Sequence, residues 1–134
     1  MAKINSVENK IILGGLCSPE ILAKFSFTNG LVICDCEGYE DKLFTPESIK
    51  NLINCDVIIE LHEFIVPDIF KKLTDLFAPT HNYSFVTTDF WLKHKSRNPN
   101  KYNNYLKGLN YETKKLILEE CRPCQMRWLI LEKK

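Results

Sequence analysis

The sequence has few glycines and no long hydrophobic run. Its 134 residues include 5 glycines, and no glycine-rich phosphate loop, P-loop lysine or Gly-x-Ser-x-Gly nucleophile elbow occurs among them. No apolar run approaches the roughly twenty residues that a membrane span needs, and the N-terminal stretch "MAKINSVENK" lacks the apolar segment of a secretory signal. These absences argue against P-loop nucleotide hydrolysis and serine hydrolysis, and they predict a cytoplasmic protein with no membrane partner.

The chain also lacks an excess of charge of one sign. Its 18 Lys and Arg residues nearly balance 17 Asp and Glu residues, so the formal net charge is +1 and no overall field attracts nucleic acid. The basic, tyrosine-bearing stretch 93–105 could contact phosphates or stack bases, but such a run is usually a solvated loop or lid. With 45% hydrophobic and 26% charged residues, we expect one globular domain spanning 1–134 and no nucleic-acid partner.

Six cysteines are present, and we interpret them as reduced thiols. The chain is long enough to bury its own core, in which a free cysteine acts as a small hydrophobic residue. A zinc site built from Cys34, Cys36, Cys121 and Cys124 is the alternative. Pro123 makes the second pair a turn rather than a dedicated zinc knuckle, so our preferred interpretation assigns no metal ligand.

Three rounds of strand, turn and helix follow one another in the first part of the chain. The apolar stretches 10–15, 31–36 and 56–64 read as strands. Helices are expected to begin after Ser18 and Thr45, each followed by proline and glutamate, and after Pro67. Apolar strands alternating with amphipathic helices predict an α/β fold with a mainly parallel sheet covered by helices.

The pattern changes after Pro79. The stretch 82–88 alternates like an edge or antiparallel strand, and 126–133 reads as a closing strand. Between them, residues 93–120 form a polar segment that we expect to be a helical insertion.

Polar residues follow two of the predicted strands. Asp35, Glu37 and Glu40 lie at and after the end of the strand at 31–36, where Gly38 allows a tight turn. Glu60, His62 and Glu63 lie at the end of the next strand. Because ligands bind beyond the carboxyl ends of parallel strands, these side chains could share a metal, a substrate hydroxyl or a proton. In the alternative interpretation, Asp35 and Glu37 accept hydrogen bonds from loop amides. His62 is then a hydrogen-bonded histidine at the rim of the sheet without a functional role.

Four stretches of the chain resemble the C-terminal half of FkbM-like methyltransferases, which are class I S-adenosylmethionine-dependent enzymes. They are "CDCEGYE", "CDVIIELHEF", "THNY" and "RPCQMRWLIL". In this family an Asp-x-Glu-Gly-x-Glu motif ends the fourth strand and a glutamate closes the fifth. The resemblance implies S-adenosylmethionine as the cofactor. It also implies catalytic roles for Asp35, Glu37, Glu60 and His62, and cofactor binding by Asp35 and Gly38.

The resemblance further implies an incomplete Rossmann-like three-layer sandwich of about five strands, the last of them antiparallel. The family's cofactor loop after its first strand and the acid after its second have no counterpart here. In the family's strand order, 3-2-1-4-5-7-6, strand 1 lies beside strand 4. We therefore expect residues 10–14 to occupy that place beside 31–36, or the edge of 31–36 to stay open for a second copy.

Three functions follow from these residues. The first is the C-terminal portion of a methyltransferase, with an unknown small-molecule acceptor and weak cofactor binding by the chain alone. The alternative is a non-catalytic binding or scaffold module that uses the same half-fold as a homodimer. A metal-dependent hydrolase using Asp35, Glu60 and His62 is the third.

Overall fold

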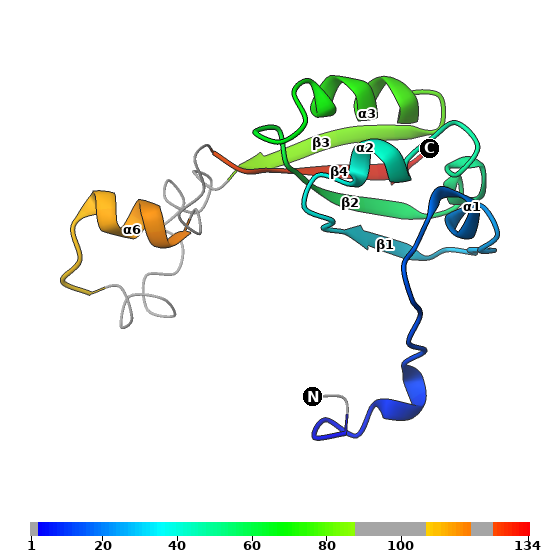
Figure 1. The fold of residues 1–134 in the computed structure, drawn as a ribbon, viewed down its shortest axis with the longest axis horizontal. Coiled ribbons are helices and arrows are strands. Elements are labelled where there is room, and N and C mark those ends of the chain that lie inside the picture. Colours follow the sequence, from blue (N-terminus) through cyan, green and yellow to red (C-terminus); the bar gives the residue numbers. More distant parts are fainter. Residues whose placement is uncertain (1–2, 88–106, 119–124) are drawn as a thin grey trace.

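The computed structural model describes residues 3–87, 107–118 and 125–134. They form an α/β fold around an open, mixed sheet of four strands in the order β1-β2-β4-β3 (Figure 1). The strands are β1 (Leu31–Cys34), β2 (Asp56–Leu61), β3 (His81–Thr87) and β4 (Arg127–Lys133). β1 and β2 are parallel, whereas β4 is antiparallel to both β2 and β3. The α/β class, the parallel pairing of the first two strands and the antiparallel last strand were all predicted.

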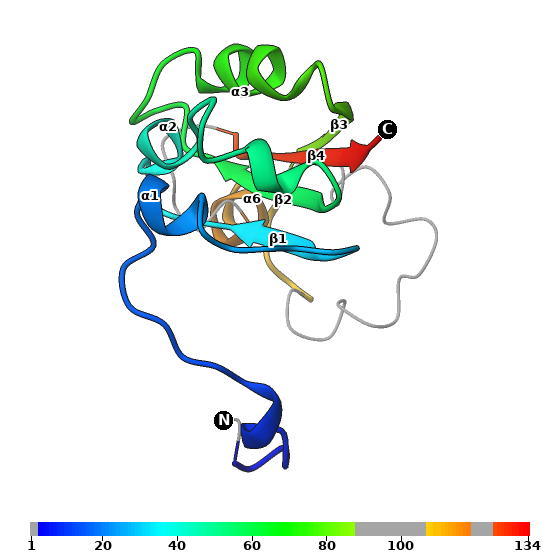
Figure 2. The same cartoon turned by 90° about the vertical axis from the view of Figure 1, so that its right-hand side faces the viewer.

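The core lies between the sheet and helix α3 (Ile69–Phe77). Alternate residues of β2, such as Val57 and Ile59, are fully buried, because side chains on a strand point to opposite faces with a period of two. Ile69, Leu73 and Phe77 of α3 are buried at helical spacing. This confirms the predicted apolar face of the helix, which lies over the sheet in Figures 1 and 2.

Two short helices precede and follow β1. α1 (Pro19–Leu22) is capped as predicted, because the Ile21 N–H donates to Ser18 Oγ at 3.3 Å and Pro19 takes the first helical position. α2 (Glu40–Leu43) is a single turn that begins directly after the acidic loop. It therefore brings Glu40 back toward the carboxyl ends of β1 and β2. The remaining elements are η1 (Glu8–Lys10), η2 (Lys50–Leu52) and α6 (Tyr111–Leu118).

The predicted strand at 10–15 is wrong. Residues 11–18 belong to no strand or helix, and Ile12 is 98% exposed. The apolar run has the composition of a strand but pairs with none of the described strands. Consequently the sheet has four strands instead of about five, and β1, which pairs with β2 alone, keeps an open edge within the described chain.

The predicted helix after Thr45 begins at the expected residue but does not continue as an α-helix. Thr45 and Ser48 exchange hydrogen bonds between hydroxyl and backbone, at 2.8 and 3.1 Å, as in a capping box. Ser48 Oγ also donates to the Leu43 carbonyl at 2.7 Å. The Ile49 N–H donates to the Thr45 carbonyl at 3.1 Å, which closes one helical turn, and the segment continues only as η2.

The described residues do not form a three-layer sandwich. Strands β1, β2 and β3 run in one direction and only the last strand, β4, runs in the opposite one. The helix-covered face of β1 carries Val32 and Cys34, which belong to or pack on the core. On the opposite face, Leu31 and Ile33 are 56% and 65% exposed, so no described helix covers them.

The predicted insertion at 93–120 lies mostly outside the described residues, except for residues 107–118, which include α6. The basic stretch 93–105 and Cys121 and Cys124 also lie outside them. Among the described helices, none is both long enough and apolar enough to cross a lipid bilayer.

Candidate functional site

The acidic residues after β1 lie on a tight turn. The Tyr39 N–H donates to the Cys36 carbonyl at 3.1 Å, and the two residues between them, Glu37 and Gly38, have φ angles of 52° and 94°. A β-carbon on Gly38 would lie 2.8 Å from Cγ2 of Ile65. Glycine is thus required at this position both by the backbone angle and by the neighbouring side chain.

His62 follows β2 directly and lies fully buried beside Glu40. Its Nδ1 is 2.9 Å from Glu40 Oε1, and neither side chain is exposed to solvent. The same Glu40 oxygen accepts a hydrogen bond from the Cys36 N–H at 3.0 Å. From these contacts we infer that Nδ1 carries the proton and donates it to Glu40, which leaves Nε2 as the acceptor nitrogen of the ring.

The other side of the imidazole faces the acidic turn. His62 Nε2 lies 3.2 Å from Glu37 Oε2 and 3.7 Å from Asp35 Oδ1. This nitrogen is buried and makes no hydrogen bond. The alternative interpretation, in contrast, expected a histidine whose polar atoms are hydrogen-bonded. The structure thus brings together Asp35, Glu37 and His62 as expected from the carboxyl ends of parallel strands.

The other predicted site residues have different places. Gly38 shapes the turn that carries Glu37. Glu60 is buried within β2, where its Cα is paired with Trp128 of β4, and it is not part of the group formed by Asp35, Glu37 and His62. The catalytic and cofactor roles of all these residues stay predictions.

The thiols of Cys34 and Cys36 lie beside this group, with their sulfur atoms 3.0 Å apart. Burial raises the pKa of both thiols above the usual value, because a thiolate is poorly solvated in an apolar environment. Neutral thiols are weak nucleophiles and weak metal ligands. The described cysteines, including Cys17 and Cys55, are free.

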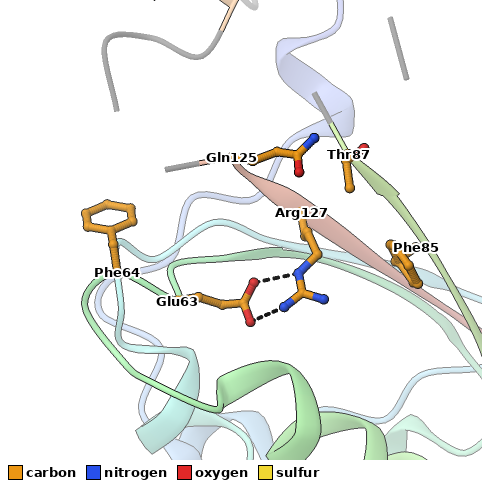
Figure 3. A pocket seen from close by; sticks show the side chains of 6 residues that line it. All are labelled: Glu63, Phe64, Phe85, Thr87, Gln125 and Arg127. Atoms are coloured by element: carbon orange, nitrogen blue, oxygen red, sulfur yellow. Dashed lines mark hydrogen bonds and ion pairs between the residues drawn. The ribbon is translucent and has the colours of Figure 1, made fainter. Parts of the chain in front are cut away.

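An open cleft of about 530 Å³ lies beside the group formed by Asp35, Glu37 and His62. Figure 3 shows the side chains that line the cleft. Arg127 and Glu63 line the cleft, and Arg127 donates hydrogen bonds to Glu63 through Nε, at 2.6 Å, and through Nη2. Its guanidinium carbon lies 4.4 Å from the centre of the Phe70 ring. Phe64 lines the cleft, and its ring centre lies 6.0 Å from that of His62. The remaining lining residues are Phe85, Thr87 and Gln125.

Sequence reasoning missed the roles of Glu40, Glu63 and Arg127. Glu40 was noted only as one more acid of the motif, since its contact with His62 depends on the direction in which α2 leaves the turn. A signal for the ion pair was present: opposite charges follow β2 and begin β4, and the two strands are antiparallel neighbours in which Leu61 pairs with Arg127.

Comparison of the chain with protein-family models, curated proteins and solved structures found no significant match.

Proposed function

We propose that this chain is the acceptor-binding portion of a class I S-adenosylmethionine-dependent methyltransferase. The order of the strands carries the proposal. β1-β2-β4-β3, with an antiparallel β4 between β2 and β3, corresponds to the 4-5-7-6 half of the strand order in that fold. The Asp-x-Glu-Gly-x-Glu motif follows β1, which is the place it takes after the fourth strand of FkbM-like enzymes.

The positions of the polar side chains suit methyl transfer to a hydroxyl. The methyl group moves from the sulfonium of S-adenosylmethionine to the acceptor oxygen. The carbon–sulfur bond breaks, the carbon–oxygen bond forms, and S-adenosylhomocysteine leaves. The acceptor proton needs a base within hydrogen-bonding reach. Asp35 and Glu37 are 47% and 66% exposed at their side chains, so both can reach an acceptor at the mouth of the site.

The cleft beside Phe64 is the proposed acceptor pocket. Its walls combine the aromatic rings of Phe64 and Phe85 with the charged pair Glu63 and Arg127. Ligand pockets are typically built in this way, from apolar surface with a few placed polar groups. An acceptor with an aromatic or aliphatic body and a polar end fits such a lining.

Nuclear magnetic resonance titration with S-adenosylhomocysteine tests the proposal. We expect weak binding, because the glycine-rich cofactor loop is absent from this sequence, with amide shifts concentrated at residues 35–40. Asp35→Asn should reduce these shifts, whereas Asp75→Asn on the exposed side of α3 should not. If residues 35–40 do not respond at the highest soluble ligand concentration, the methyltransferase assignment is wrong.

A second candidate function is a binding module that pairs through β1. One edge of β1 pairs with no strand in the described part of the chain, and Leu31 and Ile33 are exposed. Both features favour this function, because free strand edges with apolar side chains promote strand addition.

For this second function we expect light scattering to find a dimer whose mass falls to that of a monomer in Ile33→Lys. The added charge would block pairing along the edge of β1. Leu116→Lys, which changes an exposed leucine of α6, is the control and should leave the mass unchanged. A monomer at every concentration of the unaltered chain would exclude pairing through β1.

A further inference from the structure

We infer that Asp35, Glu37 and His62 form a binding site for a divalent transition-metal ion. The ligand atoms would be Asp35 Oδ1, Glu37 Oε2 and His62 Nε2, which all lie within 4.8 Å of one another. Two residues come from the turn after β1 and one from the end of β2, so a parallel strand pair holds all three.

The distances between the ligand atoms suit a common ion. A metal bound at about 2.1 Å places two of its ligand atoms about 3.0 Å apart at a right angle and about 3.4 Å apart in a tetrahedron. His62 Nε2 lies 3.2 Å from the Glu37 oxygen and 3.7 Å from the Asp35 oxygen. The three ligand atoms lie within 4.8 Å of one another, so an ion would need to draw the carboxylates of Asp35 and Glu37, which are 47% and 66% exposed, closer together.

The state of His62 Nε2 separates this group from an ordinary acidic cluster. This nitrogen is buried and makes no hydrogen bond, although Glu37 Oε2 is close enough for one. The carboxylate oxygen therefore lies to the side of the nitrogen's lone-pair axis instead of on it. Oxygens to the side of that axis are what a metal ion on the axis requires, since its ligands surround the ion and do not bond to one another.

Glu40 acts as a positioning residue for His62. Its Oε1 accepts from Nδ1 and from the Cys36 N–H, which fixes both the ring orientation and the tautomer that leaves Nε2 available. Histidines that bind metals almost always donate their other N–H to a carboxylate, carbonyl or water in this way. Three carboxylates around one imidazole also concentrate negative charge, which a cation would neutralise.

The donor set indicates the class of ion. Imidazole suits zinc, iron, nickel and copper, and carboxylates also suit manganese, whereas magnesium and calcium prefer ligand sets made only of oxygen. Three protein ligands leave further coordination positions open, and the exposure of Asp35 and Glu37 turns these positions toward solvent. A hydroxyl or carbonyl oxygen of a small molecule could bind there.

The metal site does not depend on methyl transfer. If both proposals hold, the ion would polarise the acceptor hydroxyl. If the chain binds the ion but no S-adenosylhomocysteine, the metal site stands and the methyltransferase assignment fails. Titration with S-adenosylhomocysteine thus tests the methyltransferase assignment, and titration with metal ions separately tests the metal site.

Calorimetry with Zn²⁺ and Mn²⁺, and line broadening of amide signals by Mn²⁺, test the site. We expect one ion per chain and broadening that begins at residues 35–40 and 62–64. Asp35→Asn and Glu37→Gln should each lower the affinity at least about tenfold, and Glu40→Gln should do so by about ten- to a hundredfold.

Asp75→Asn provides the matched control, because Asp75 is an exposed acid of α3 that pairs with Lys71. It should leave the affinity unchanged. The site is refuted if neither ion binds, or if Asp35→Asn and Glu37→Gln bind as tightly as the unaltered chain. Broadening that is as strong around Asp75 as at residues 35–40 would show adventitious surface binding and would equally overturn the proposal.

Discussion

Replacing Gly38 by alanine is expected to lower the free energy of unfolding by about 2 to 5 kcal/mol. Two costs add together. At a φ of 94° an L-residue is strained by about 1 to 2 kcal/mol. The new β-carbon would also lie 2.8 Å from Ile65 Cγ2, and overpacking of this kind costs about 1 to 3 kcal/mol. Urea denaturation followed by circular dichroism measures the loss.

Two further variants separate these costs. In Gly14→Ala nothing lies within 4 Å of the new methyl group, so its stability should change by less than about 0.5 kcal/mol. In an Ile65→Ala background the 2.8 Å contact disappears and the contact with the β-carbon of residue 65, at 3.2 Å, remains. The alanine should then cost less than in the unaltered chain, but at least the strain of about 1 to 2 kcal/mol. Our description of the turn is wrong if Gly38→Ala is as harmless as Gly14→Ala.

The sequence predicted Gly38 as the residue of a tight turn but could not predict Ile65 as its neighbour. The turn depends on local chemistry, since a glycine between acids after an apolar strand favours a reversal of the chain. The close contact depends on where the chain returns after β2. The packing of α3 on the sheet sets the path of this return. A local sequence pattern does not predict that packing.

A strand was predictable where a segment has both an apolar or alternating sequence pattern and a neighbouring strand with which to pair. β1 and β2 read as apolar runs, and β3 and β4 followed from the change in pattern after Pro79. Residues 10–15 have an equally apolar pattern and yet form no strand. Pairing requires a free edge in the right place, and a local run of apolar residues shows only that a segment is able to pair.

The convergence of Asp35, Glu37 and His62 was predictable from topology. Side chains that follow two adjacent parallel strands meet at one edge of the sheet, and the pairing of Ile33 with Ile58 sets this register. Glu60 shows the limit of the reasoning. It was expected at the rim but lies inside β2, where its Cα pairs with Trp128 of β4, whereas His62 follows the end of the strand.

The buried pair of Glu40 and His62 was not predictable, because it needs a one-turn helix that directs Glu40 back under the acidic turn. The burial of this pair is also the reason for the largest expected effect in the molecule. A buried ionisable side chain is tolerated when it is hydrogen-bonded, and it becomes costly when its partner is removed.

Replacing His62 by leucine is expected to lower the free energy of unfolding by about 3 to 5 kcal/mol. Glu40 would keep only the Cys36 N–H on Oε1, since Oε2 already has no hydrogen-bond partner. Urea denaturation with a chelator present measures the loss, so that a bound metal ion does not contribute.

His81→Leu is the matched comparison. His81 is also buried, but its ring nitrogens contact the Cys55 carbonyl and the Thr80 hydroxyl, at 2.9 and 2.8 Å. Its replacement leaves no carboxylate behind and should cost about 1 to 3 kcal/mol. A loss in His62→Leu no greater than that in His81→Leu would mean that Glu40 does not depend on His62.

A double-mutant cycle then isolates the interaction between the two side chains. Glu40→Met removes the carboxylate, so that adding His62→Leu no longer leaves a buried carboxylate without its hydrogen-bond partner. The double variant should therefore be more stable than the sum of the single losses implies, by about 1 to 3 kcal/mol. Additive losses would show that the contact between Glu40 and His62 contributes nothing to stability. Glu40 would then lose its role as the residue that orients the imidazole toward Asp35 and Glu37.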